Sequence, residues 1–165
     1  MKSKRYIYIL LLFILCLSIS GCKKIVVYNE TDTDKYIDAY YEYLSDQKQG
    51  FVAIDFRMLE TEYAEGHLKG FVSYQFYKTR NADESDAAYE QRMSENFVKW
   101  MVNNYSKSLT VFLLDDNGTT VQKEIIKLKN IGYKKIYGYT GNFDLLKEHA
   151  SGIIEIVKGT DDCGC

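Results

Sequence analysis

A short apolar run at residues 109–114, followed by a polar loop and a helical repeat, constrains the fold of this chain more than any other feature. The run is apolar except for Thr110, as expected of a strand buried on both faces of a parallel sheet. Residues 115–118 are polar or glycine and end the strand. Beyond them, Val121, Ile125 and Leu128 recur at helical spacing, which predicts an amphipathic helix packed on the same sheet. This order of strand, loop and helix is typical of an α/β domain.

The loop between this strand and this helix is the first candidate functional site. At such a junction the backbone N–H groups and the positive end of the helix dipole point at one spot, so the loop can hold an anion. The predicted anion-cradle loop consists of Asp115, Asp116, Asn117, Gly118, Thr119 and Thr120. Because Asp115 is itself an anion, we expect backbone amides of the loop to hydrogen-bond its carboxylate. The side chain would then act as a built-in anion that repels free sulfate or phosphate.

Composition limits both the number of domains and the class of partner. The chain has 165 residues, 46% of them hydrophobic, which is enough for one domain with a core and cramped for two. Its formal net charge is -2. If Lys2, Lys4 and Arg5 are removed with an amino-terminal leader, 18 of the 21 basic residues remain against 23 acidic ones. This acidic balance argues against nucleic acid as a partner.

The amino terminus predicts export and lipid anchoring. Basic residues precede an apolar run at 6–17, which is shorter than the ~20 residues of a membrane-spanning helix and gives way to small residues. The ending Ile19-Ser20-Gly21-Cys22 resembles the bacterial lipobox, whose Cys receives a diacylglyceryl group and becomes the mature first residue. We therefore predict a lipoprotein signal peptide at 1–21, and acyl chains on Cys22 that hold the protein on the extracytoplasmic side of the cell membrane. An ordinary cleaved signal with an incidental Cys is the alternative.

The rest of the mature chain alternates between strand and helix patterns. Residues 25–28 and 51–56 read as strands, and apolar residues at helical spacing between them predict a helix. An aromatic and methionine stripe across 82–105 indicates a further helix packed on the core rather than a cofactor site. Residues 153–157 resemble a closing strand or docking segment. These patterns predict one domain at 22–158, followed by a flexible tail at 159–165.

The region after the second predicted strand carries a motif of the form D-x-R followed by E-[FY]-x-x-G-H-[IL]-x-G. The residues that match it are Asp55, Arg57, Glu62, Gly66, His67 and Gly70. This pattern resembles the hallmark of the rhodanese family, and the resemblance extends over roughly residues 25–149. It implies a single rhodanese-like α/β domain with a central, mostly parallel sheet of about five strands, helices on both faces, and residues 71–76 as the next strand. It also implies structural roles for the motif, with Asp55 and Arg57 as an internal ion pair and His67 as a structural histidine.

One position departs from this family. The family's loop after the central strand reads C-x-x-G-x-[RT], and its Cys carries a persulfide, whereas this chain has Asp115 at the first position. A carboxylate cannot accept and hand on a sulfane sulfur, because that chemistry needs a polarizable thiolate. The sequence therefore predicts no catalytic residue of the family type and no cofactor. It favours a protein that is not an enzyme, a binding or interaction module with a protein or small-anion partner.

An enzyme is the competing class. The cradle loop also resembles the haloacid dehalogenase motif D-x-D-G-T, with Asp115 as a nucleophile, but Asn117 stands where that motif has its general acid/base and only 45 residues follow Thr120. A calcium-binding EF-hand loop fails because its glycine would fall on Thr120. The thiol pair Cys163 and Cys165 could return to the cradle loop, although an isolated C-x-C lacks the partners of a tetrahedral zinc site, and we predict no metal.

The lipobox generates the first prediction. We expect Cys22 to be the lipidated mature terminus, because the basic start, the apolar run and the small residues before Cys22 occur in the order of a lipoprotein signal. Mass spectrometry of the protein extracted from membranes checks this, with Cys22→Ser as the matched variant. An unmodified Cys22, or a soluble secreted form that Cys22→Ser leaves unchanged, would contradict the prediction.

Overall fold

The computed structural model describes residues 23–46, 50–74, 81–116 and 118–160, and at its centre lies a five-stranded sheet. The strand order is β1-β6-β5-β2-β4, and every neighbouring pair is parallel. The strands are β1 (Lys24–Tyr28), β6 (Lys135–Tyr139), β5 (Thr110–Leu114), β2 (Phe51–Asp55) and β4 (Phe71–Ser73). This arrangement confirms the predicted α/β domain with a mostly parallel sheet of about five strands.

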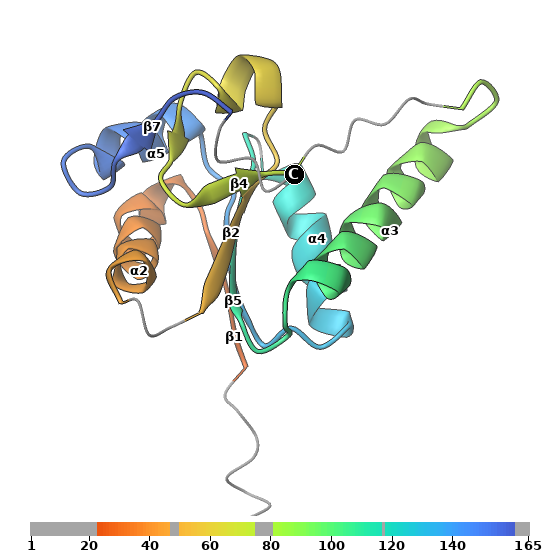
Figure 1. The fold of residues 1–165 in the computed structure, drawn as a ribbon, viewed down its shortest axis with the longest axis horizontal. Helices are drawn as coiled ribbons and strands as arrows, with labels where there is room; N and C mark the ends of the chain where they lie inside the picture. The colour runs from red at the N-terminus through yellow and green to blue at the C-terminus, as the bar shows by residue number, and fades with distance from the viewer. Residues whose placement is uncertain (1–22, 47–49, 75–80, 117, 161–165) are drawn as a thin grey trace, which may run out of the picture.

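Helices cover both faces of the sheet, as predicted (Figure 1). On one face lie α2 (Thr33–Ser45) and α5 (Phe143–Ala150), and on the other lie α3 (Asp86–Asn104) and α4 (Thr119–Asn130). The central strand β5 is buried at all five positions. Its side chains point alternately to the two faces of the sheet. Phe112 and Leu114 pack with α2 and α5, whereas Val111 and Leu113 pack with α3 and α4.

Tyrosines build much of the core on the α2 side of the sheet. Phe112 lies against Tyr40 at a ring-centroid distance of 5.1 Å and stacks on Tyr137 at 4.9 Å. A buried tyrosine needs a partner for its hydroxyl, and backbone carbonyls supply it. The Tyr40 hydroxyl donates to the Lys69 carbonyl at 2.7 Å, and the Tyr63 hydroxyl donates to the Phe71 carbonyl at 2.7 Å. These two hydroxyls therefore tie the segment before β4, and the first residue of β4, to buried rings of the core.

Three predicted segments differ in extent from the structure. Within 82–105 the helix runs over Asp86–Asn104, and Ser85 caps it by accepting from the Ala88 N–H at 3.3 Å. Within 153–157 only Ile156–Val157 form a strand, β7, which pairs antiparallel with β3 (His67–Leu68). The predicted strand at 71–76 is described as far as residue 74 and is a strand over Phe71–Ser73. The described residues do not include the rest of that predicted strand, at 75–76. They also do not include the predicted signal peptide, Cys22, Asn117, Cys163 and Cys165.

A short 3-10 helix, Glu30–Asp32, and a short π-helix, Leu59–Tyr63, complete the elements of the part of the chain that the structure describes. None of the helices among these residues is both long enough and apolar enough to span a membrane.

An ion pair inside the protein orders the connection after β2. The Arg57 Nη2 lies 2.6 Å from the Asp55 Oδ2, and the side chains of Asp55 and Arg57 are 0% and 3% exposed. Arg57 Nη2 also donates to the Gly66 carbonyl at 2.9 Å, and the guanidinium stacks over the Phe143 ring at 3.2 Å. Burial raises the pKa of the Asp55 carboxyl, and hydrogen bonds from Arg57 oppose that rise. The sequence prediction of an internal ion pair is confirmed.

We therefore predict that Asp55→Asn lowers the free energy of unfolding by about 3 to 5 kcal/mol, because it leaves the buried Arg57 charge uncompensated. The matched control is Glu155→Ala, which breaks an ion pair with Lys69 whose side chains are 57% and 61% exposed. That control should cost about 0 to 1 kcal/mol, as exposed ion pairs do. Urea denaturation measures both changes, and equal losses in the two variants would show that burial of the Asp55–Arg57 pair carries no special weight.

Candidate functional site

The candidate site lies at the carboxyl edge of the sheet, where β5 ends and the cradle loop (residues 115–120) leads into α4. Gly118 is the residue before α4 and has φ +70°, a left-handed conformation that glycine adopts without strain. A Cβ at this position would also lie 2.6 Å from the Thr140 Cα, so the loop packs directly against the chain that follows β6. This close approach fixes the position of the loop relative to the sheet.

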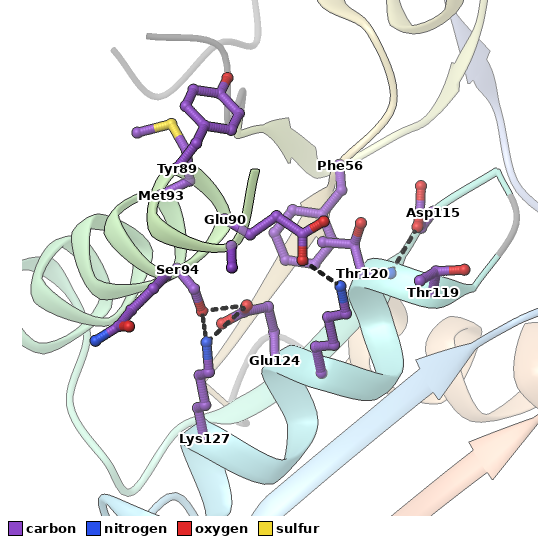
Figure 2. A pocket seen from close by; sticks show the side chains of 13 residues that line it. Phe56, Tyr89, Glu90, Met93, Ser94, Asp115, Thr119, Thr120, Glu124 and Lys127 are labelled. Carbon is purple, nitrogen blue, oxygen red and sulfur yellow. Dashed lines mark hydrogen bonds and ion pairs between the residues drawn. The ribbon is translucent and has the colours of Figure 1, made fainter. Parts of the chain in front are cut away.

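The Asp115 carboxylate lies in the centre of this loop and is 7% exposed as a residue. Its Oδ1 accepts from the Asp116 N–H at 2.8 Å, and its Oδ2 accepts from the Thr120 N–H at 3.0 Å. Figure 2 shows the second of these bonds between the Asp115 side chain and the first turn of α4. The amides at the start of the helix thus face a carboxylate that belongs to the chain itself, as the sequence predicts.

The surroundings of the cradle loop are acidic. Partial desolvation and then the Glu62 carboxylate raise the pKa of Asp116, while the Arg57 guanidinium lowers it and Asp115 and Asp144 add to the rise. Asp144 lies in the first turn of α5. Several carboxylates therefore share the space around the loop, and an incoming anion meets repulsion from each of them.

The residues of the family motif lie at the end of β2 and in the segment between β2 and β4. His67 stacks on Tyr63 with ring centroids 3.7 Å apart, and its Nδ1 lies 3.0 Å from the Tyr63 carbonyl oxygen. Glu62 Oε2 accepts from the Met58 N–H at 2.7 Å and so holds the start of the short π-helix. Gly70 has φ +85°, and a Cβ there would lie 2.8 Å from the Tyr40 hydroxyl. Together with Asp55, Arg57 and the Gly66 carbonyl, these contacts shape the turn between β2 and β4.

A pocket of about 680 Å³ opens between α3 and α4 and reaches the cradle loop (Figure 2). It is lined by Phe56, Ala87, Tyr89, Glu90, Gln91, Met93, Ser94, Asp115, Thr119, Thr120, Lys123, Glu124 and Lys127. Its volume lies within the range of about 300 to 1,000 Å³ that small-molecule sites occupy. The pocket brings Asp115 into one space with charged residues of the two helices.

Ser94, Glu124 and Lys127 form a polar cluster in this pocket that was not predicted from the sequence. Glu124 is 2% exposed as a residue, its Oε1 accepts from the Ser94 hydroxyl, and the Lys127 ammonium donates to the same hydroxyl. Lys127 Nζ lies 3.7 Å from Glu124 Oε1. Burial raises the pKa of the Glu124 carboxyl, and Ser94 and Lys127 oppose the rise. One signal was available, because Glu124 continues the stripe of Val121, Ile125 and Leu128 that faces the core.

Other predicted site residues are not placed. Cys22, Asn117, Cys163 and Cys165 lie outside the described residues. Among the residues that the structure describes, no three His, Cys, Asp or Glu side chains form a group that could hold a metal ion.

Comparison with known proteins gives a consistent result for the fold. The model of the rhodanese-like domain family matches residues 36–149. The crystal structure of the Alr3790 protein from Anabaena sp. is 15% identical with a TM-score of 0.53, and the match covers 74% of this chain and 90% of that one. SseA from Escherichia coli, a 3-mercaptopyruvate sulfotransferase of the rhodanese fold, is 16% identical with a TM-score of 0.53 over 85% of this chain and 54% of that one. A search of curated proteins finds no match. At these identities the two structures support the fold alone.

Proposed function

The chain belongs to the rhodanese-like domain family, and from this premise we propose that it is a catalytically silent member that acts as a binding or interaction module. The observation that carries the proposal is the Asp115 carboxylate, which accepts hydrogen bonds from the amides of Asp116 and Thr120. A lipid anchor on Cys22 would hold the module at the extracytoplasmic face of the membrane.

Sulfur transfer by the family mechanism needs a nucleophile that this loop lacks. A thiolate attacks the outer sulfur of a donor such as thiosulfate, a persulfide forms, and sulfite leaves with the electron pair of the broken S–S bond. Residue 115 is the position that the family resemblance assigns to that thiol, and its carboxylate cannot form a persulfide. The two amides that would surround the sulfur are already engaged by the carboxylate.

The same hydrogen bonds tie the Asp115 side chain to the amides of Asp116 and Thr120 without any ligand. Each charge-assisted bond to Asp115 contributes about 1.5 to 3 kcal/mol before desolvation is subtracted. The carboxyl edge of a parallel sheet is the usual place for ligand binding in α/β proteins. These features support a binding surface at the loop where the family has its reactive Cys.

The first experiment measures sulfite release from thiosulfate with cyanide or a thiol as acceptor. We expect no turnover by the natural domain and a gain of turnover by Asp115→Cys, whose thiol pKa the loop amides would lower. Turnover by the natural domain would contradict the proposal. If Cys163→Ser combined with Cys165→Ser then abolished that turnover, the activity would belong to the tail thiols, and otherwise it would belong to another group.

The second experiment tests whether Asp115 acts as the built-in anion of the cradle loop. We expect Asp115→Ala to bind sulfate more tightly than the natural domain by about fivefold or more, because a like charge a few ångströms away costs ~1 kcal/mol even in water. Calorimetric titration with sulfate measures the two dissociation constants.

The control for this titration is Asp144→Asn, which removes one negative charge near the loop and leaves the Asp115 hydrogen bonds in place. The Asp144 side chain is 82% exposed, so its effect on sulfate binding should be screened to about twofold or less. Equal sulfate affinity of the natural domain and Asp115→Ala would show that Asp115 does not occupy the anion position.

A further inference from the structure

Exposed lysines gather at the amino edge of the central sheet, the edge opposite the cradle loop. The five strands are parallel and therefore begin at this edge, which lies at the bottom of Figure 1, away from α5 and β7. Lys24 and Lys135 are the first residues of β1 and β6, Lys107 precedes β5, and Lys129 lies in the last turn of α4. We call this surface the basic edge, and its members are Lys23, Lys24, Lys107, Lys129, Lys134 and Lys135.

The basic edge is one continuous surface, although its lysines come from four separate segments. The Lys24 N–H donates to the Lys134 carbonyl at 2.8 Å, and Lys24 is in register with Lys135 on the neighbouring strand. A Cβ at Gly132 would lie 3.6 Å from the Lys107 Cδ, so the connection before β5 packs against the turn before β6. Strands that pair lie about 4.8 Å apart, and the ammonium groups therefore share one face.

The charges of the basic edge have no carboxylate partner. None of its six lysines forms an ion pair with any residue that the structure describes. Lysines elsewhere differ, because a carboxylate oxygen lies 2.5 to 2.9 Å from the ammonium nitrogen of Lys35, Lys123 and Lys147. The positive charge at the amino edge is therefore available to an external anion.

Local structure explains little of this clustering. Of the six lysines, only Lys129 lies in the last turn of a helix, where the helix dipole favours a cation. The end of α2 adds two acidic residues to this edge, Glu42 and Asp46, so the positive charges remain in excess. Because the whole chain carries 23 acidic and 21 basic residues, the basic edge runs against the overall balance of charge.

The position of this edge in the chain indicates which anionic surface it meets. The predicted lipidated residue, Cys22, stands only two residues before the start of β1, and two residues span at most about 7 Å. The acidic cradle loop lies at the other end of β5, and five residues of strand rise about 16 Å. That separation exceeds the Debye length of about 8 Å at physiological ionic strength, so the cradle loop does not cancel the field of the basic edge.

We propose that the basic edge docks on a bilayer that contains anionic phospholipid, with its lysine ammonium groups on the headgroup phosphates. The acyl anchor and the basic edge would then hold the domain in one orientation, with the cradle loop directed away from the membrane. This inference rests on the lipid anchor of the proposed function and deepens it, because it names the lipid class and the protein surface that contact each other.

The experiment measures co-sedimentation of the mature chain carrying Cys22→Ser, which has no acyl chain, with two kinds of vesicle. We expect binding to equal parts of phosphatidylglycerol and phosphatidylcholine to be about tenfold or more tighter than binding to phosphatidylcholine alone. Salt at about 1 M should abolish the difference, because the Debye length falls to about 3 Å.

A triple variant tests whether the basic edge is the contact surface. Lys107→Gln, Lys134→Gln and Lys135→Gln change three exposed side chains, and a lysine near an anionic surface is worth about fivefold in affinity. Together they should weaken binding to the anionic vesicles by about tenfold or more.

The matched control is a second triple variant, Lys35→Gln, Lys123→Gln and Lys147→Gln. It changes the net charge by the same amount at side chains that are 73%, 54% and 47% exposed and lie outside the basic edge. It should change the affinity by about twofold or less, because these charges are screened from a membrane at the amino edge. Thermal unfolding of both triple variants verifies that they are folded.

Equal binding to the two kinds of vesicle, or equal losses in the two triple variants, would overturn the inference. Absence of binding to the anionic vesicles would overturn it too and would leave the lysines to a soluble acidic partner. Failure of the proposed function is distinguishable, because a missing anchor appears as unmodified Cys22 and a catalytic domain appears as sulfite release. Neither of those results alters the binding of the unacylated chain to vesicles.

Discussion

Burial of β5 on both faces is the constraint on which the rest of the structure depends. Phe112 and Leu114 enter one helical layer and Val111 and Leu113 the other, so neither layer can shift without exposing apolar surface of the same strand. The strand pairs in register with β2 on one side and β6 on the other. The neighbouring strands and the two helical layers therefore fix the position of the carboxyl end of β5. Asp115 is the next residue, so its place at the edge of the sheet is fixed as well.

Around that place the protein uses fixed charges in two different ways. The charges of the Asp55–Arg57 pair have their partners inside the protein, because the guanidinium contacts the carboxylate, the Gly66 carbonyl and the Phe143 ring. This pair orders the turn after β2. The Asp115 carboxylate also has internal partners, two amides of its own loop. Glu124 differs from both, because Oε1 has a donor in Ser94 and Oε2 has none among the described residues. Charges that are satisfied internally order the connections at the carboxyl edge of the sheet.

The cradle loop and the pocket between α3 and α4 share helix α4. Thr120 in its first turn donates to Asp115, and Glu124, one turn later, faces the pocket. In a member of this family with a reactive thiol, the start of this helix would stabilise negative charge on sulfur. Here the chain supplies that negative charge as a carboxylate, and the adjoining wall carries more acidic than basic groups. A carboxylate at residue 115 and the acidic excess of the adjoining wall would both disfavour an incoming anion.

The sequence by itself determined the strand, loop and helix around residue 115, the internal pair of Asp55 and Arg57, and the hydrogen bonding of Asp115. These features depend on neighbours in the chain, so periodicity, loop chemistry and motif spacing reveal them. Only the tertiary structure decided the pairing of β7 with β3 and the environment of Glu124. Helical spacing predicts that Glu124 faces the core. Its donor, Ser94, lies on another helix, and the sequence between the two residues does not show which side chain will contact Glu124. Contacts between distant segments follow from packing, which no local pattern encodes.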